Sequence, residues 1–232
     1  MKKNIFIVFL LFYVNFSIAQ NTLDLLGLTN ATPAASAYSL RKLSTSYVGN
    51  AIQVRRSSDN TTQDIGFTGS GDLDTAALKT FVGANNGFVT IWYDQSGNAR
   101  NLTQSTTSKQ PSIINSGTVY RRNSKPVCFH DASDDGLLYS GSDYLTSTPL
   151  SVNIIAGSNA TSNNNRRAVQ GTSNWLIGPY GNNHGWFANG WNHTITTAWS
   201  TTDVEIFTVI EPVTNTCTSW RNGVSQTLSG NI

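Results

Sequence analysis

The chain contains only two glutamates, Glu205 and Glu211. Glu205 lies between Val204 and Ile206, so in a strand its side chain projects on the face opposite to theirs. A carboxylate placed in this way could line a concave sheet and act as a catalytic group, although a solvated side chain on an outward face is the plainer interpretation. Acetal hydrolysis usually takes two carboxyl groups roughly 5 to 10 Å apart. Glu211 precedes Pro212 and is expected at the surface, which leaves Glu205 as a weak catalytic candidate without a partner.

The segment DASDDG offers oxygen ligands for a hard cation. Asp131, Ser133 and Asp135 alternate before Gly136, a spacing that can wrap Ca²⁺. An EF-hand would require Glu at the twelfth position, where this chain has Ser142. A structural calcium ion and an ordinary polar turn both fit this segment. The three histidines show no spacing typical of zinc ligands, so no other cofactor is expected.

Aromatic and amide side chains are concentrated between residues 175 and 199. Flat aromatic rings pack against the apolar C–H faces of sugars, and amides hydrogen-bond to the hydroxyl rim. The alternative is that these rings fill a β-sheet core, where large aromatics are also common. The pattern indicates a glycan partner, and the candidate sugar-binding residues are Trp175, Tyr180, Asn182, Asn183, His184, Trp186, Asn189 and Trp191.

An aromatic strand runs into a polar turn between residues 87 and 104. Asp94 can accept hydrogen bonds from the backbone N–H groups that follow it, and Gly97 can adopt a positive φ. A catalytic corner and a structural bend are both conceivable, and the pattern favours the bend. The turn is therefore expected to build the fold.

The elements that would position these residues are mostly strands. Strands are expected at Ala51–Arg56 and Phe88–Tyr93, the second buried on both faces, and in the segment DVEIFTVIEPV. A short helix capped by Asp72 or Asp74 should end at Gly83. The pair Asn222-Gly223 suits a type I′ hairpin turn. Few charges and many Ser, Thr, Asn and Gly residues are typical of one large all-β domain.

The first nineteen residues have the features of a signal peptide. Lys2 and Lys3 precede a short apolar run and a small-residue cleavage site before Gln20. The run is too short to span a bilayer, so we expect a secreted or cell-surface protein without a membrane span. Removal of the two lysines leaves 13 of the 15 basic residues against 13 acidic ones. A neutral chain lacks the positive charge expected of a nucleic-acid binder.

Several motifs together resemble the catalytic domain of α-L-arabinofuranosidase B, family 54 of the glycoside hydrolases. They are AYSLRKLSTSYVGNAIQVRRSSDNTTQDIG, the helix ending in Phe81, and FVTIWYDQSGNARNLTQ, which follow one another over Ala37–Gln104. Beyond Pro111 the chain is more loosely similar to laminin-G-like and concanavalin-like lectin domains. The resemblance implies a concanavalin-like, jelly-roll β-sandwich. Residues 20–33 are then a lead-in and residues 34–232 the sandwich.

The chain departs from this family at the sites that carry its chemistry. Val82 and Gly87 stand where members have a cysteine pair, and the adjacent cysteines that touch the sugar are missing. The nucleophile is a Glu before Asn-Asn, and the nearest counterpart here, YGNNHGWFANG, contains no Glu. The acid/base, an Asp in a Gly-Gly-Asp-Asn turn, would fall after Ile232. The sandwich is therefore expected to be truncated at its C-terminal edge, with further domains beyond.

Three functional hypotheses follow from these observations. The first is a carbohydrate-binding domain on an arabinofuranosidase B-like scaffold, without turnover. The second is an active α-L-arabinofuranosidase with diverged or missing acids. The third is a structural or adhesion domain of a longer surface protein. Cys128 and Cys217, the only cysteines, could form a disulfide in an exported protein or remain two buried thiols.

Overall fold

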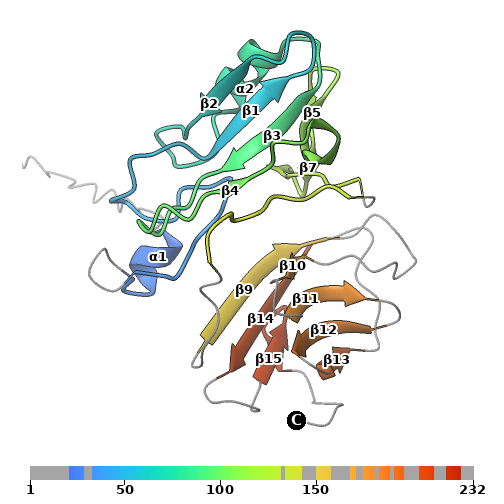
Figure 1. The fold of residues 1–232 in the computed structure, drawn as a ribbon. Coiled ribbons are helices and arrows are strands. Elements are labelled where there is room, and N and C mark those ends of the chain that lie inside the picture. The colour runs from blue at the N-terminus through green and yellow to red at the C-terminus, as the bar shows by residue number, and fades with distance from the viewer. Residues whose placement is uncertain are drawn as a thin grey trace, which may run out of the picture.

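The structure is a computed structural model in which β-strands predominate (Figure 1). The segment expected to be the signal peptide lies outside the part of the chain that it describes. The described residues are 21–28, 33–131, 134–142, 150–157, 168–170, 175–180, 183–188, 191–195, 204–211 and 218–225.

The first half of the chain forms one antiparallel sheet with a short helix packed on it. The sheet order is β2-β1-β3-β5-β6, and β4 pairs with β3. A two-stranded ribbon, β7-β8, follows. The elements are α1 Thr22–Leu25, β1 Ile52–Arg56, β2 Thr62–Ile65, α2 Thr75–Val82, β3 Gly87–Trp92, β4 Leu102–Thr103, the 3₁₀ turn η1 Thr107–Lys109, β5 Ser112–Asn115, β6 Thr118–Val119, β7 Arg121–Arg122 and β8 Lys125–Pro126.

The helix α2 covers the buried face of this sheet. Its N-cap is Asp74, whose side chain accepts hydrogen bonds from the backbone N–H groups of Ala76 and Ala77 at 3.1 and 2.9 Å. The helix ends at Gly83, where φ is +62°. Asp74 is thus the cap and Gly83 the end, as the sequence predicted. Asp72 instead lies 3.4 Å from the ammonium group of Lys125.

The core of the first half lies between α2 and the sheet. Its buried side chains are aliphatic, and each valine, leucine or isoleucine among them contributes roughly 1.5–3 kcal/mol of burial free energy. Strand β3, which was expected to be buried on both faces, is fully buried at Val89, whereas Phe88 and Thr90 are half-buried. The core cluster comprises Ala51, Ile52, Val54, Ile65, Leu73, Leu78, Val82, Val89, Ile113, Ile114 and Val119.

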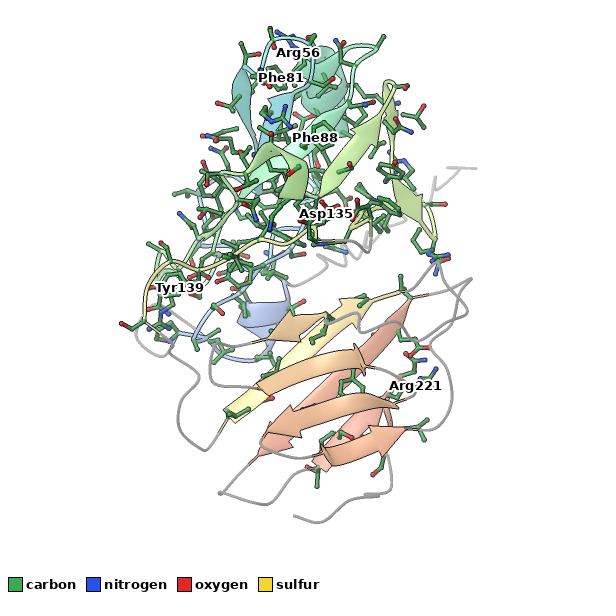
Figure 2. The ribbon with its side chains drawn as sticks, turned by 45° about the vertical axis from the view of Figure 1, so that its right-hand side comes forward. Arg56, Phe81, Phe88, Asp135, Tyr139 and Arg221 are labelled. Carbon is green, nitrogen blue, oxygen red and sulfur yellow. The ribbon has the colours of Figure 1, made fainter. Side chains whose placement is uncertain are left out.

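The second half of the chain forms two four-stranded antiparallel sheets, which Figures 1 and 2 show one over the other. One has the order β10-β11-β12-β13 and the other β16-β15-β14-β9. Asn222 and Gly223 have φ values of +51° and +78°, so the hairpin between β15 and β16 forms as predicted. The strands are β9 Leu150–Ala156, β10 Val169–Gln170, β11 Trp175–Tyr180, β12 Asn183–Ala188, β13 Trp191–Ile195, β14 Glu205–Glu211, β15 Thr218–Arg221 and β16 Val224–Ser225.

The polar turn that follows β3 holds the irregular segment 34–43 in place. The carboxylate of Asp94 is buried and accepts hydrogen bonds from the N–H groups of Ala37, Ser96 and Arg100 at 2.8, 2.9 and 3.0 Å. The Ser96 hydroxyl donates a fourth at 2.8 Å. Gly97 has φ +94°, which confirms both expectations for this turn.

Gln95, which is 2% exposed, extends the same attachment. Its amide donates to the carbonyl groups of Ser39 and Arg41 at 2.9 and 3.1 Å, and its Oε1 accepts from Leu43 N–H at 2.8 Å. Side chains of this turn therefore satisfy backbone groups that no strand ladder pairs. The turn and segment 34–43 form one structural unit.

We predict that Asp94→Asn lowers the free energy of unfolding by about 2–4 kcal/mol, because an amide turns one acceptor oxygen into a donor that faces other donors. Urea unfolding followed by tryptophan fluorescence measures this change. Asp134→Asn is the matched control, since its side chain is half exposed beside Lys109 and should change stability by less than about 1 kcal/mol. Equal effects of the two substitutions would contradict the structural role of Asp94.

Candidate functional site

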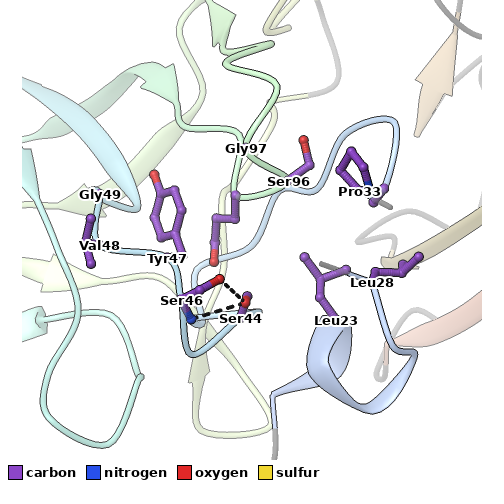
Figure 3. Close-up of a pocket in the computed structure, with 12 residues that line it drawn as sticks. Leu23, Leu28, Pro33, Ser44, Ser46, Tyr47, Val48, Gly49, Ser96 and Gly97 are labelled. Carbon is purple, nitrogen blue, oxygen red and sulfur yellow. Dashed lines mark hydrogen bonds between the residues drawn. The ribbon is translucent and has the colours of Figure 1, made fainter. Parts of the chain in front are cut away.

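A small pocket lies beside the 94–97 turn, between that turn, α1 and the loop 44–49 (Figure 3). Its volume is about 200 Å³, which is below the roughly 300–1,000 Å³ of pockets for drug-sized ligands. None of the twelve lining residues carries a carboxylate or a cationic group. They are Leu23, Leu28, Pro33, Ala34, Ser44, Ser46, Tyr47, Val48, Gly49, Gln95, Ser96 and Gly97.

The wall formed by α1 is attached to the loop through Asp24. Its carboxylate accepts hydrogen bonds from the Ser44 hydroxyl at 2.8 Å and from the N–H and hydroxyl of Thr45 at 2.9 and 2.7 Å. The hydrogen bonds from Thr45, supported by that from Ser44, lower the pKa of Asp24 to about 2. The pocket lining thus combines hydroxyl and amide groups with apolar side chains and carries no charge.

Glu205, the candidate catalytic carboxylate, is buried at 3% exposure. It forms an ion pair with the guanidinium of Arg221, whose side chain is 17% exposed (Figure 2 labels Arg221). On β14, Phe207 and Val209 are buried on the same face, whereas Ile206 is 50% exposed. The expectation of a solvated side chain on an outward face was wrong, because Arg221 on the neighbouring strand supplies the charge that permits burial.

The ion pair changes what Glu205 can do chemically. A carboxylate bound to a guanidinium has fewer lone pairs free for a substrate. The sequence did not identify Arg221 as its partner. The only local signal was the Asn222-Gly223 turn, which fixes the register of β15 against β16. That turn does not determine the pairing of Phe207 with Arg221, because this pairing depends on the longer-range contact between β14 and β15.

The acidic loop is described only in part, since Ser133 lies outside the described residues. The Asp131 N–H donates to Asp135 Oδ2 at 2.9 Å, as in an ordinary polar turn. Partial burial raises the pKa of Asp135. Among the described residues no three His, Cys, Asp or Glu side chains are grouped closely enough to hold a metal ion. The calcium site stays a prediction.

The aromatic and amide residues lie on three adjacent strands, β11, β12 and β13. The backbone register places Trp186 opposite Ile177 on one side and His193 on the other. The same pairing brings six of the predicted sugar-binding residues into one sheet, while Asn182 and Asn189 lie outside the described residues. The six are Trp175, Tyr180, Asn183, His184, Trp186 and Trp191.

Cys128 is a free cysteine that packs against the core cluster. Burial, with a smaller contribution from the Asp135 carboxylate, raises the pKa of its thiol to about 12. For this residue the free thiol was one of the two alternatives drawn from the sequence. Cys217, its proposed partner in the other alternative, lies outside the described residues.

Comparisons with known proteins agree with this fold. Residues 24–134 match the family described as alpha-L-arabinofuranosidase B, catalytic, and these 111 residues are just under half of the 232-residue chain. This match makes residues 24–134 similar to the catalytic domain of a glycoside hydrolase. More particularly, the chain resembles the catalytic domain of α-L-arabinofuranosidase B, as the motifs of residues 37–104 predicted.

Curated relatives are similar to this chain over a short stretch. Alpha-L-arabinofuranosidase B of Aspergillus niger is 43% identical over 75 residues, and alpha-L-arabinofuranosidase of Hypocrea jecorina is 39% identical over 77 residues. These alignments cover 32% and 33% of this chain and 15% of each relative. The matched part is thus a small share of the relatives' length.

Two solved structures share the fold. One is a GH54 arabinofuranosidase soaked with a cyclic sulfate inhibitor, with TM-score 0.52 and 19% identity. The other is an arabinofuranosidase complexed with arabinofuranosyl-α-1,2-xylobiose, with TM-score 0.51 and 17% identity. Each comparison covers 86% of this chain and 50% of the solved chain. Among the described residues, no helix is both long and apolar enough to span a membrane.

We predict that Glu205→Ala lowers the free energy of unfolding by about 3 kcal/mol, because it leaves the Arg221 guanidinium without its carboxylate. The double variant Glu205→Ala/Arg221→Ala should lose less than the sum of the two single variants. Chemical unfolding of all four proteins gives the coupling energy. Additive losses would show that the ion pair contributes nothing to stability.

We also predict that acid detaches α1 from the loop at Thr45. The folded-state pKa of Asp24 is lowered to about 2 from the usual value of 3.8. The stability that Asp24 contributes is therefore present above about pH 4 and is lost as the pH falls through about 2. The amide NMR shifts of Leu23 and Thr45 should move over this window in the wild-type protein. In Asp24→Asn they should stay constant, and an unchanged wild-type Thr45 amide would exclude the mechanism.

Proposed function

We propose that this chain is an exported carbohydrate-interacting domain on an α-L-arabinofuranosidase B-like scaffold, which binds arabinofuranosyl-bearing polysaccharide without turnover. The match over residues 24–134 is the observation that carries the proposal. Export would take place through the signal peptide expected at residues 1–19. The protein would then act outside the cell or at its surface.

The use of the acids in the described part of the chain supports binding without turnover. Asp94 satisfies backbone donors, and Glu205 is held by Arg221. Hydrolysis needs a carboxylate to attack or stabilise an oxocarbenium-like centre and a second group to protonate the leaving oxygen. Binding needs neither charge. A neutral set of aromatic and amide groups is sufficient for it.

The candidate binding residues lie on β11, β12 and β13. Trp186 and Trp191 would pack against sugar rings, while Asn183 and His184 would hydrogen-bond to hydroxyl groups. One solved neighbour was obtained with arabinofuranosyl-α-1,2-xylobiose, which favours arabinose-substituted xylan or arabinan as the ligand. Calcium bound by the 131–135 loop would have a structural role only.

The second candidate function is arabinofuranoside hydrolysis by diverged acids. It is favoured by the relatives, which are named as α-L-arabinofuranosidases. A structural or adhesion domain of a longer surface protein is the third candidate. The two experiments below separate the three.

We predict no release of nitrophenol from nitrophenyl α-L-arabinofuranoside, and retarded migration in gels that contain arabinan or arabinoxylan. Trp186→Ala or Trp191→Ala should weaken this retardation by about tenfold, the usual effect of removing a central aromatic contact. Leu138→Ala, at a residue that is 60% exposed and outside the pocket, is the control and should migrate like the wild-type protein.

Two results would overturn this function. Nitrophenol release that disappears in Glu205→Gln, at unchanged melting temperature, would establish an enzyme. If the wild-type protein migrates without retardation on arabinan, arabinoxylan and β-glucan, it does not bind these glycans, and the third candidate, a structural or adhesion domain, is the one that remains.

A further inference from the structure

One face of the sheet β16-β15-β14-β9 is exposed. Ile155 on β9 is 71% exposed, and Ile206, its partner on β14, is 50% exposed. On β14 the other face is buried, since Phe207 and Val209 are 2% and 0% exposed. The exposed face belongs to a different sheet from β11, β12 and β13.

A row of neutral side chains crosses this face. The register pairs Asn153 with Thr208, Thr208 with Trp220, and Trp220 with Ser225, one residue on each strand. At a strand spacing of about 4.8 Å, the row is about 14 Å long. The Thr208 hydroxyl donates to Asn153 Oδ1 at 2.8 Å, which fixes the amide and directs its Nδ2 donors away from this bond.

The charged side chains Glu205 and Arg221 lie on the face of the sheet opposite to the neutral row. They are paired there, on the buried face. Six residues lie on the opposite face and none is ionisable: Asn153, Ile155, Ile206 and Ser225, which are exposed, and Thr208 and Trp220, which are half-buried. A charged ligand would gain nothing from this face. A neutral polymer would lose no ionic hydration on binding to it.

We propose that this exposed face binds a neutral polysaccharide chain that lies across the four strands. The proposal rests on the proposed function and adds a second contact surface to it. The Trp220 ring would pack against a sugar ring, the isoleucines would cover its apolar edge, and the amide of Asn153 would donate to a hydroxyl. A second copy of this chain fits less well, because a homodimer interface core is mostly apolar and the row itself contains an amide and two hydroxyls.

The test compares variants by affinity electrophoresis of the full chain on neutral arabinan and on anionic polygalacturonate. Trp220→Ala should weaken retardation on arabinan by about tenfold, and Trp220→Phe should recover most of it. Asn153→Asp keeps the acceptor for Thr208 but removes the donors and adds charge, so it should weaken binding comparably. Val224→Ala is the matched control. Val224 is 65% exposed on β16 but pairs with Arg221, outside the row.

Melting temperatures identify any variant that fails to fold. If Trp220→Ala is unstable, the retardation of Asn153→Asp still shows whether this face binds the polysaccharide. This inference would be overturned, and the proposed function would stand, if Trp220→Ala and Asn153→Asp were retarded like the wild-type protein while Trp186→Ala was not retarded. An unretarded wild-type protein would overturn both. If sedimentation shows that the wild-type protein self-associates and that Ile206→Ser abolishes this, the face binds a second copy of the chain. If retardation is stronger on polygalacturonate than on arabinan, the face binds an anionic ligand. Either result would overturn the inference.

Discussion

The buried carboxylate of Asp94 is surrounded by four donors, three of them backbone N–H groups. A carboxylate is costly to bury unless its oxygens are hydrogen-bonded, and here each oxygen accepts two bonds. Segment 34–43 has a single isolated bridge to the rest of the fold, between Arg41 and Asp72. Its position depends on Asp94 and Gln95, and so does the floor of the pocket beside α1. The end of β3, the irregular segment and the pocket are thus connected through two neighbouring side chains, Asp94 and Gln95.

The same use of acids recurs through the described part of the chain. Asp24 attaches a helix to a loop, Asp59 pairs with Arg56, and Glu205 pairs with Arg221. These three carboxylates are engaged in the fold, and the exposed face of β9 and β14 that carries Asn153, Ile155 and Ile206 is neutral. That division fits recognition of a polymer through ring faces and hydroxyl groups.

Local signals predicted the local structure well. Asp74 and Gly83 delimit α2, Gly97 takes a positive φ, and Asn222-Gly223 forms its hairpin, because each depends on a few neighbouring residues. The burial of Glu205 was not predictable in this way. It depends on which strand pairs with β14, a contact between residues 16 positions apart, and an alternating strand does not reveal which of its faces is covered. The helix α1 was also missed, since its four residues are too few to show a periodic pattern.

The candidate site shows the same limit. The aromatic and amide composition of residues 175–191 predicted a glycan partner, and strand pairing brings the six described candidates into one sheet. Trp220 was visible in the sequence only as part of a hairpin. Its place in a row with Asn153 requires β9 and β14 to pair across about fifty residues, which no local pattern encodes.

The thiol of Cys128 has a consequence for how an exported chain matures. Burial raises the pKa of this thiol, so the thiolate, which is the form that attacks a disulfide, is scarcer in the folded protein than in the unfolded chain. Once the core has closed, exchange with an oxidant at this sulfur would be slow. Any covalent link made by Cys128 must therefore form early, while the chain is still folding and the sulfur is in water, and the folded protein would keep whichever redox state it had reached by then.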